Sequence, residues 1–166
     1  MNNLKIIRNK IFDRRDKKLE NFLNILKFQD KKIVFTNGVF DILHRGHIEY
    51  LSKAADMGNI LIVGLNTDKS VRSLGKGDGR PIQDQQSRAM IVASLHFVDM
   101  VVMFDENTPF ELIKMIKPDV LVKGSDYKTE EIIGYDIVTS NGGIVKTIDF
   151  VSGFSTTNIE KKIKKL

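Results

Sequence analysis

The sequence predicts an α/β protein built as a single doubly wound domain around a parallel, Rossmann-like sheet. Short runs of apolar and β-branched residues, of the kind that forms parallel strands, recur along the chain. Segments with helix signals lie between them, and this alternation of strand and helix is typical of a parallel sheet covered by helices on both faces. The expected strands, about five in the spatial order 3-2-1-4-5, are residues 32–35, 60–65, 99–104, 119–122 and 144–148.

The first expected helix covers residues 16–28. Apolar residues from Leu19 to Leu26 recur on one face of this segment, and lysines surround them. We expect residues 1–30 to form an N-terminal leader helix that packs on the domain or contacts a second subunit. Residues 31–166 are expected to form the domain itself.

The segment after the first strand, residues 36–47 (TNGVFDILHRGH), is the most informative part of the chain. Asn37-Gly38 predicts a turn, and from Ile48 onward apolar residues recur at helical spacing. His44 and His47 therefore lie where a strand gives way to a helix. In an open parallel sheet this junction is at the carboxyl end of the strand, where ligands bind and where the free N–H groups of the helix attract anions.

The two histidines allow three interpretations. They could bind a metal, but the chain has no cysteine and His96 is the only other histidine, so carboxylates would have to complete the site. They could simply cap a helix. The neighbouring Gly46 favours the third interpretation, a phosphate site, because it lets a ligand approach the backbone closely while both imidazoles donate hydrogen bonds.

Residues 69–81, after the second strand, are rich in glycine and basic side chains, which predicts a mobile loop over phosphates. Lys76 lies between two glycines and Arg80 precedes a proline, so both are candidates for phosphate binding. Lys69 and Arg72 fit an ordinary surface loop equally well.

Two later segments start with helix signals. Thr108, Pro109 and Glu111 form a capping box with proline at the first helical position, which predicts a helix to about residue 116. In the last helix Thr157 and Glu160 form a second capping box. The hydroxyl groups that precede it are then available to bind a triphosphate.

Composition limits the function classes. The absence of cysteine excludes thiol and redox chemistry at cysteine and fits a reducing, cytoplasmic location. No apolar run is long enough to span a membrane and no signal peptide is visible, so no membrane partner is expected. The net charge of +5 comes largely from lysines at the C-terminal end, and no nucleic-acid-binding module is present. We therefore expect no nucleic-acid partner.

Residues 44–47 (HRGH) resemble the His-x-Gly-His signature of the cytidylyltransferase-like nucleotidylyltransferase superfamily. The rest of the chain resembles one branch of it, the bacterial heptose-1-phosphate adenylyltransferases, over residues 31–162. The motifs that carry the resemblance, in matching order, are residues 74–82 (LGKGDGRPI), Arg88, residues 119–127 (DVLVKGSDY) and residues 155–159 (STTNI).

This resemblance implies an enzyme that transfers the adenylyl group of ATP to D-glycero-β-D-manno-heptose 1-phosphate. The products would be ADP-heptose, used in lipopolysaccharide core biosynthesis, and pyrophosphate. It also implies Mg²⁺ bound with ATP, a homodimer, and a separate heptose kinase and phosphatase in the same pathway, because the sugar kinase domain fused to many members is absent from this sequence.

The resemblance further implies roles for individual residues. The expected catalytic residues are His44, His47, Lys76 and Arg88. Asp41 is expected to orient either Lys76 or a substrate hydroxyl. The expected nucleotide-binding residues are Thr36, Asn37, Gly38, Phe40, Arg80, Lys123, Gly124, Asp126, Ser155, Thr156 and Thr157.

Two other functions stay open. A cytidylyltransferase that acts on glycerol 3-phosphate or another small phosphate would share these motifs. A nucleotide-binding module without activity is the other alternative, but such a module is expected to have lost a histidine of the signature, and both are present.

Overall fold

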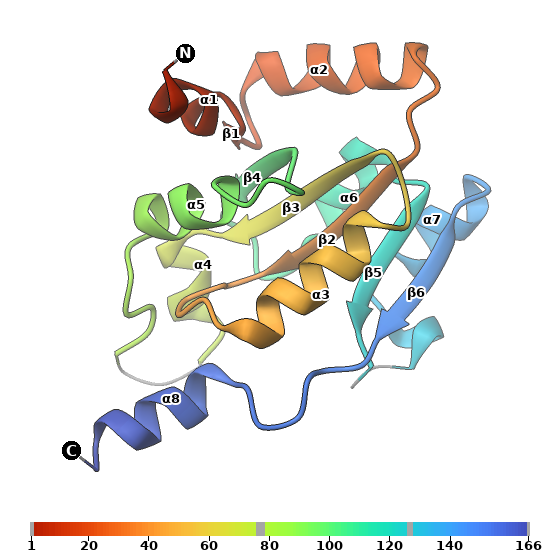
Figure 1. Cartoon of the computed structure of the whole chain (residues 1–166). Coiled ribbons are helices and arrows are strands. Elements are labelled where there is room, and N and C mark those ends of the chain that lie inside the picture. Colours follow the sequence, from red (N-terminus) through yellow and green to blue (C-terminus); the bar gives the residue numbers. More distant parts are fainter. Residues whose placement is uncertain (1, 76–78, 126–127, 166) are drawn as a thin grey trace.

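The computed structural model describes residues 2–75, 79–125 and 128–165, and within these ranges a six-stranded sheet forms the centre of the molecule (Figure 1). All its strand pairs are parallel. Its order is β1-β4-β3-β2-β5-β6, which confirms the doubly wound class and the predicted order of the five expected strands. The strands are β1 (Ile11–Asp13), β2 (Ile33–Gly38), β3 (Ile60–Asn66), β4 (Met100–Phe104), β5 (Val120–Gly124) and β6 (Ile144–Ile148).

The N-terminal segment contains more than the expected helix. Helix α2 (Lys17–Phe28) matches the prediction, but α1 (Asn3–Asn9) and the edge strand β1 precede it. Strand β1 pairs with β4 and buries Phe12, so this segment contributes a strand to the main sheet. A three-residue strand is too short to show an apolar run, which is why the sequence did not indicate it.

Helices cover both faces of the sheet, and Figure 1 shows α3 (Arg45–Ala55) and α5 (Gln85–Ala93) in front of it and α6 (Phe110–Ile116) and α7 (Tyr135–Ser140) behind it. The core accordingly divides into two clusters. One joins α3 and α5 to the sheet, and the other joins α2, α6 and α7 to its opposite face. None of the helices in the described ranges is both long and apolar enough to cross a membrane.

The end of β2 differs from the prediction. Asn37 and Gly38 continue the strand, paired with Gly64 and Leu65 of β3, so a turn at these two residues is wrong. The chain turns at Phe40 instead, which has a positive φ of 49°. A Cβ atom on Gly38 would lie 2.9 Å from the Phe40 ring, so a larger residue there would displace the ring from its place over the strand end.

Part of the predicted loop is a helix. Residues Asp68–Ser73 form α4, which Thr67 caps and which buries Ser70 and Val71 against the sheet. Tertiary packing therefore orders a segment that has no sustained apolar period. Lys76, the central residue of that predicted loop, lies outside the described residues.

Both predicted capping boxes are wrong. Helix α6 begins after Pro109 and has no side-chain cap. Helix α8 (Thr156–Ile163) is capped by Ser155, whose Oγ accepts a hydrogen bond from the Asn158 N–H at 3.1 Å. The helix therefore starts two residues earlier than the predicted box requires, and Glu160 makes an ion pair with Arg80 instead. A short 3-10 turn, η1 (Thr129–Glu131), completes the described helical elements.

Candidate active site

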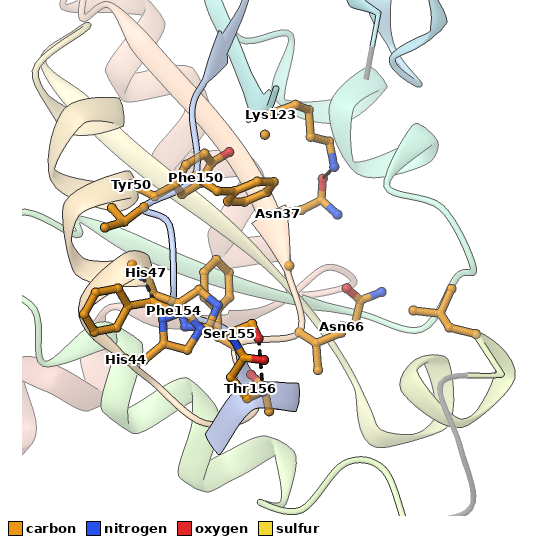
Figure 2. Close-up of a pocket in the computed structure, with 18 of the residues that line it drawn as sticks. Asn37, His44, His47, Tyr50, Asn66, Lys123, Phe150, Phe154, Ser155 and Thr156 are labelled. Atoms are coloured by element: carbon orange, nitrogen blue, oxygen red, sulfur yellow. Dashed lines mark hydrogen bonds between the residues drawn. The ribbon is translucent and has the colours of Figure 1, made fainter. Parts of the chain in front are cut away.

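A cavity of about 790 Å³ lies at the carboxyl edge of the sheet. Its walls come from the ends of β2, β3 and β5, the start of α3, and the segment that leads into α8 (Figure 2). The volume is that of a typical small-molecule site. The predicted site residues that line it are Asn37, Gly38, Phe40, His44, His47, Lys123, Gly124, Ser155 and Thr156.

The two histidines of the signature form the base of this cavity. His44 is the N-cap residue of α3, and its carbonyl accepts the His47 N–H at 2.9 Å. The imidazole rings stack with their centroids 3.8 Å apart, and the Phe40 ring meets His47 edge-on at 5.2 Å. The positive φ of Phe40 and the helix start thus fix both imidazoles at the end of β2.

Both imidazoles are neutral at neutral pH. Burial, followed by the proximity of His44, lowers the pKa of His47 to about 4, although the Ile42 carbonyl acts in the opposite direction. Burial also lowers the pKa of His44. A neutral imidazole carries one N–H donor, so the pair can donate hydrogen bonds without carrying charge of its own.

The nitrogen atoms of the two rings are not equivalent. His44 Nδ1 is occupied by a long contact of 3.4 Å with the His47 N–H, which makes its shorter hydrogen bond of 2.9 Å to the His44 carbonyl. His47 Nδ1 is buried and has no hydrogen bond of good geometry within the described part of the chain. The Nε2 atoms are therefore the ones available to a ligand.

A lysine and an asparagine face each other at the other end of the cavity. Lys123, at the end of β5, donates a hydrogen bond of 2.5 Å from Nζ to Asn37 Oδ1 at the end of β2. The bond fixes the Asn37 amide and brings a positive charge to the cavity wall (Figure 2). This end of the cavity can attract an anion or a polar group of a ligand.

Thr36 does not line the cavity but connects the elements that form it. Its side chain is fully buried, and its Oγ1 lies 2.7 Å from Tyr50 Oη, which donates to the Val122 carbonyl at 3.1 Å. These contacts connect β2, α3 and β5. Among the described residues, the predicted nucleotide-binding residues that do not line the cavity are Thr36, Arg80 and Thr157.

Arg88 was predicted to lie at the phosphates, but the structure does not bring it into the cavity. Its side chain is fully buried. Its guanidinium donates to the Gln83 carbonyl at 3.0 Å, to the Val39 carbonyl at 2.7 Å and to Asp68 at 2.7 Å. Because Val39 is itself a cavity residue, Arg88 fixes the wall of the site from behind.

Arg80 and Asp41 pair with each other. Asp41 accepts hydrogen bonds of 2.9 Å from the N–H groups of Ile82 and Gln83 and from Arg80. Burial by itself would raise the pKa of Asp41, but these donors outweigh it and the pKa is lowered. The second amino group of Arg80 binds Glu160 of α8 at 2.8 Å. Lys76, one predicted partner of Asp41, and Asp126 lie outside the described residues.

Sequence reasoning missed the aromatic and amide residues of the cavity. Tyr50 stacks on Phe150 with ring centroids 6.4 Å apart, and Arg45 lies 5.5 Å from the Phe154 ring centroid. Asn66 and Asn107 add two amides. The sequence held one weak signal for the aromatic residues, namely two phenylalanines close together outside any expected strand or helix.

The fold and the site define a class: a doubly wound α/β protein with a histidine pair at the carboxyl end of its central strand. A family model described as Cytidylyltransferase-like matches residues 35–162. The chain belongs to this cytidylyltransferase-like family.

Curated relatives carry the name Bifunctional protein HldE. The protein of that name from Campylobacter jejuni subsp. doylei is 54% identical over 153 residues, which are 92% of this chain and 32% of the relative. The one from Nitratiruptor sp. is 57% identical over 134 residues, or 81% of this chain and 28% of the relative. The chain thus spans about a third of the length of the curated relatives it matches.

Two solved structures share the fold. The lipopolysaccharide core biosynthesis protein from Thermoplasma volcanium is 32% identical with a TM-score of 0.60, covering 73% of this chain and 97% of that one. The pantoate-beta-alanine ligase from Francisella tularensis has a TM-score of 0.60 over 90% of this chain and 76% of its own. Its identity of 18% makes it similar in fold alone.

Proposed function

We propose that this chain is an adenylyltransferase that joins ATP and D-glycero-β-D-manno-heptose 1-phosphate to give ADP-heptose and pyrophosphate. The observation that carries the proposal is the pair of stacked, neutral histidines, His44 and His47, inside a cavity of about 790 Å³ at the carboxyl end of β2. Support for the sugar substrate comes from the relatives named HldE and from the similarity to a lipopolysaccharide core biosynthesis protein.

In the proposed reaction an oxygen of the sugar phosphate attacks the α-phosphorus of ATP. The new phosphorus–oxygen bond forms on one side as the bond to the β-phosphate oxygen breaks on the other, and pyrophosphate leaves with the electron pair. No covalent enzyme intermediate is required. Catalysis then consists of positioning the two phosphates and stabilising the charge that develops on the oxygens.

The histidine pair supplies that stabilisation. Each ring donates one N–H to phosphate oxygens whose negative charge grows toward the transition state. The start of α3 adds the partial positive charge of its backbone N–H groups at the same place.

We assign the remaining predicted residues in three groups. Asn37, Gly38, Phe40, Lys123, Gly124, Ser155 and Thr156 line the cavity and are proposed to contact the nucleotide, together with Lys76, Asp126 and Thr157. Thr36 and Arg88 are proposed to act as positioning residues through the buried contacts described above. Arg80 would contact a phosphate by releasing one of its two carboxylates, Asp41 or Glu160.

We propose that Mg²⁺ enters as part of the ATP substrate. Magnesium commonly binds substrate phosphates and keeps several waters. The described residues bring together no group of three or more histidine, cysteine or carboxylate side chains that could hold a metal. No step is therefore assigned to a metal held by the protein. A cytoplasmic homodimer, supplied with substrate by a heptose kinase and a phosphatase, completes the proposal.

A cytidylyltransferase for a small phosphate is the second candidate, because the matching family is described as Cytidylyltransferase-like. The test is pyrophosphate release from ATP or CTP, each combined with heptose 1-phosphate or glycerol 3-phosphate. We expect kcat/KM to be highest for ATP with heptose 1-phosphate. A preference for CTP with glycerol 3-phosphate would replace the proposed function, and no release in any combination would favour a binding module.

A further inference from the structure

Asn66 is a buried polar side chain on the cavity wall that the reaction described above does not use. It is the last residue of β3 and is 4% exposed. Figure 2 shows it across the cavity from Tyr50 and Phe150, and it lies on the side of β2 opposite to Lys123. Its amide therefore faces a different part of the cavity from the Lys123–Asn37 pair.

The hydrogen bonds around Asn66 fix which end of its amide faces the cavity. Its Nδ2 lies 2.9 Å from Ser70 Oγ, and Ser70 Oγ lies 2.8 Å from the Glu106 carbonyl. A carbonyl can only accept, so the single hydroxyl proton of Ser70 goes to Glu106. Ser70 must then accept from Asn66, which turns the NH₂ group toward α4 and the Oδ1 atom away from it.

The Oδ1 atom has no hydrogen bond to any of the described residues. It is a neutral acceptor held in a fixed direction, in a cavity whose wall also carries the donors His44, His47 and Lys123. An acceptor disfavours phosphate oxygens, which are also acceptors, and favours a hydroxyl group. Asn107, from the turn after β4, also lines the cavity and adds a second amide to it.

We propose that Asn66 Oδ1 accepts a hydrogen bond from a hydroxyl group of the sugar phosphate and helps to determine acceptor specificity. This inference rests on the proposed function. It places the two substrates on opposite sides of β2, with the nucleotide toward β5, the sugar toward β3, and the histidine pair between them. Ser70 is then a positioning residue, because it fixes the Asn66 amide.

The test compares Asn66→Ala with Asn141→Ala, a matched loss of an exposed asparagine at the C-cap of α7. Steady-state pyrophosphate release is measured with ATP and heptose 1-phosphate. We expect Asn66→Ala to raise KM for the sugar phosphate about tenfold, as for a lost hydrogen bond, and to leave KM for ATP within about twofold. Asn141→Ala should match the wild type in both.

A series of deoxy sugar 1-phosphates identifies the hydroxyl. For one deoxy compound the ratio of the wild-type to the Asn66→Ala value of kcat/KM should fall to about one, because the hydroxyl that Asn66 binds is already absent. Ser70→Ala keeps the asparagine but frees its amide, and we expect a smaller rise in KM for the sugar phosphate. If Asn66→Ala does not fold, the KM of Ser70→Ala for the sugar phosphate tests the proposal instead.

The outcomes separate this inference from the proposed function. If the wild type releases no pyrophosphate with any sugar 1-phosphate, the proposed function is wrong, and the inference falls with it. If the wild type is active but the variants leave KM for the sugar phosphate unchanged, the inference alone is wrong. A rise in KM for ATP alone would assign Asn66 to the nucleotide and also overturn the inference.

Discussion

Acid should destabilise the folded protein through His47. Its pKa is about 4 in the folded state, compared with 6.5 for an ordinary histidine. Between these two values the unfolded chain binds a proton that the folded chain does not, so the free energy of unfolding falls as the pH falls through this interval. The stability that depends on a neutral His47 is fully present above pH 6.5 and is lost near pH 4. The difference between the two pKa values corresponds to about 3 kcal/mol in the free energy of unfolding.

Urea unfolding at pH 7 and at pH 4.5 measures this effect. The wild type should lose about 2–3 kcal/mol more than His47→Gln over that range, because glutamine has no proton to gain. His96→Gln serves as the control, since His96 is exposed and lies outside the cavity. If His47→Gln loses as much free energy of unfolding as the wild type, the lowered pKa of His47 is wrong.

Three further substitutions test separate parts of the site. His47→Ala should lower kcat about 100- to 1000-fold while ATP affinity by calorimetry changes little, and a near-normal kcat would reduce His47 to a structural residue. Glu160→Gln removes the ion pair with Arg80 and should speed hydrogen exchange in α8 about two- to fivefold. The control Lys161→Gln, on the same helix, should leave the exchange rate unchanged. Equal exchange rates in the two variants would show that the ion pair does not hold α8. Tyr50→Phe should lower the free energy of unfolding by about 1–3 kcal/mol in urea, because two buried partners lose a hydrogen bond, and an unchanged value would contradict that role.

The sheet was largely predictable because its central strands are nearly continuous apolar runs. The edge strand β1 was not, because a three-residue strand such as Ile11–Asp13 has no detectable period. Helix α4 was missed for a different reason, since Thr67 caps it and the sheet buries Val71, neither of which an apolar repeat reports. Local signals alone also misassigned the two capping boxes.

The histidine pair could be predicted because His44 and His47 are close in the sequence and lie at a strand-to-helix junction. Asn66 and Phe150 come from distant segments, and only the topology brings them to the same cavity. Arg88 is the converse case, because the sequence identifies the residue but not its environment. Its position in the motif does not reveal that its guanidinium is buried and bonded to Val39 and Asp68.

The central claim is that the adenylyl group of ATP passes to a sugar phosphate. The most direct measurement uses ATP labelled with ³²P at either the α- or the γ-phosphate, incubated with heptose 1-phosphate and separated by chromatography. We predict that the α-label appears in the sugar nucleotide and the γ-label in pyrophosphate, with neither on the protein. Transfer of the γ-label to the sugar, or an α-label that stays in ATP or AMP, would contradict the account.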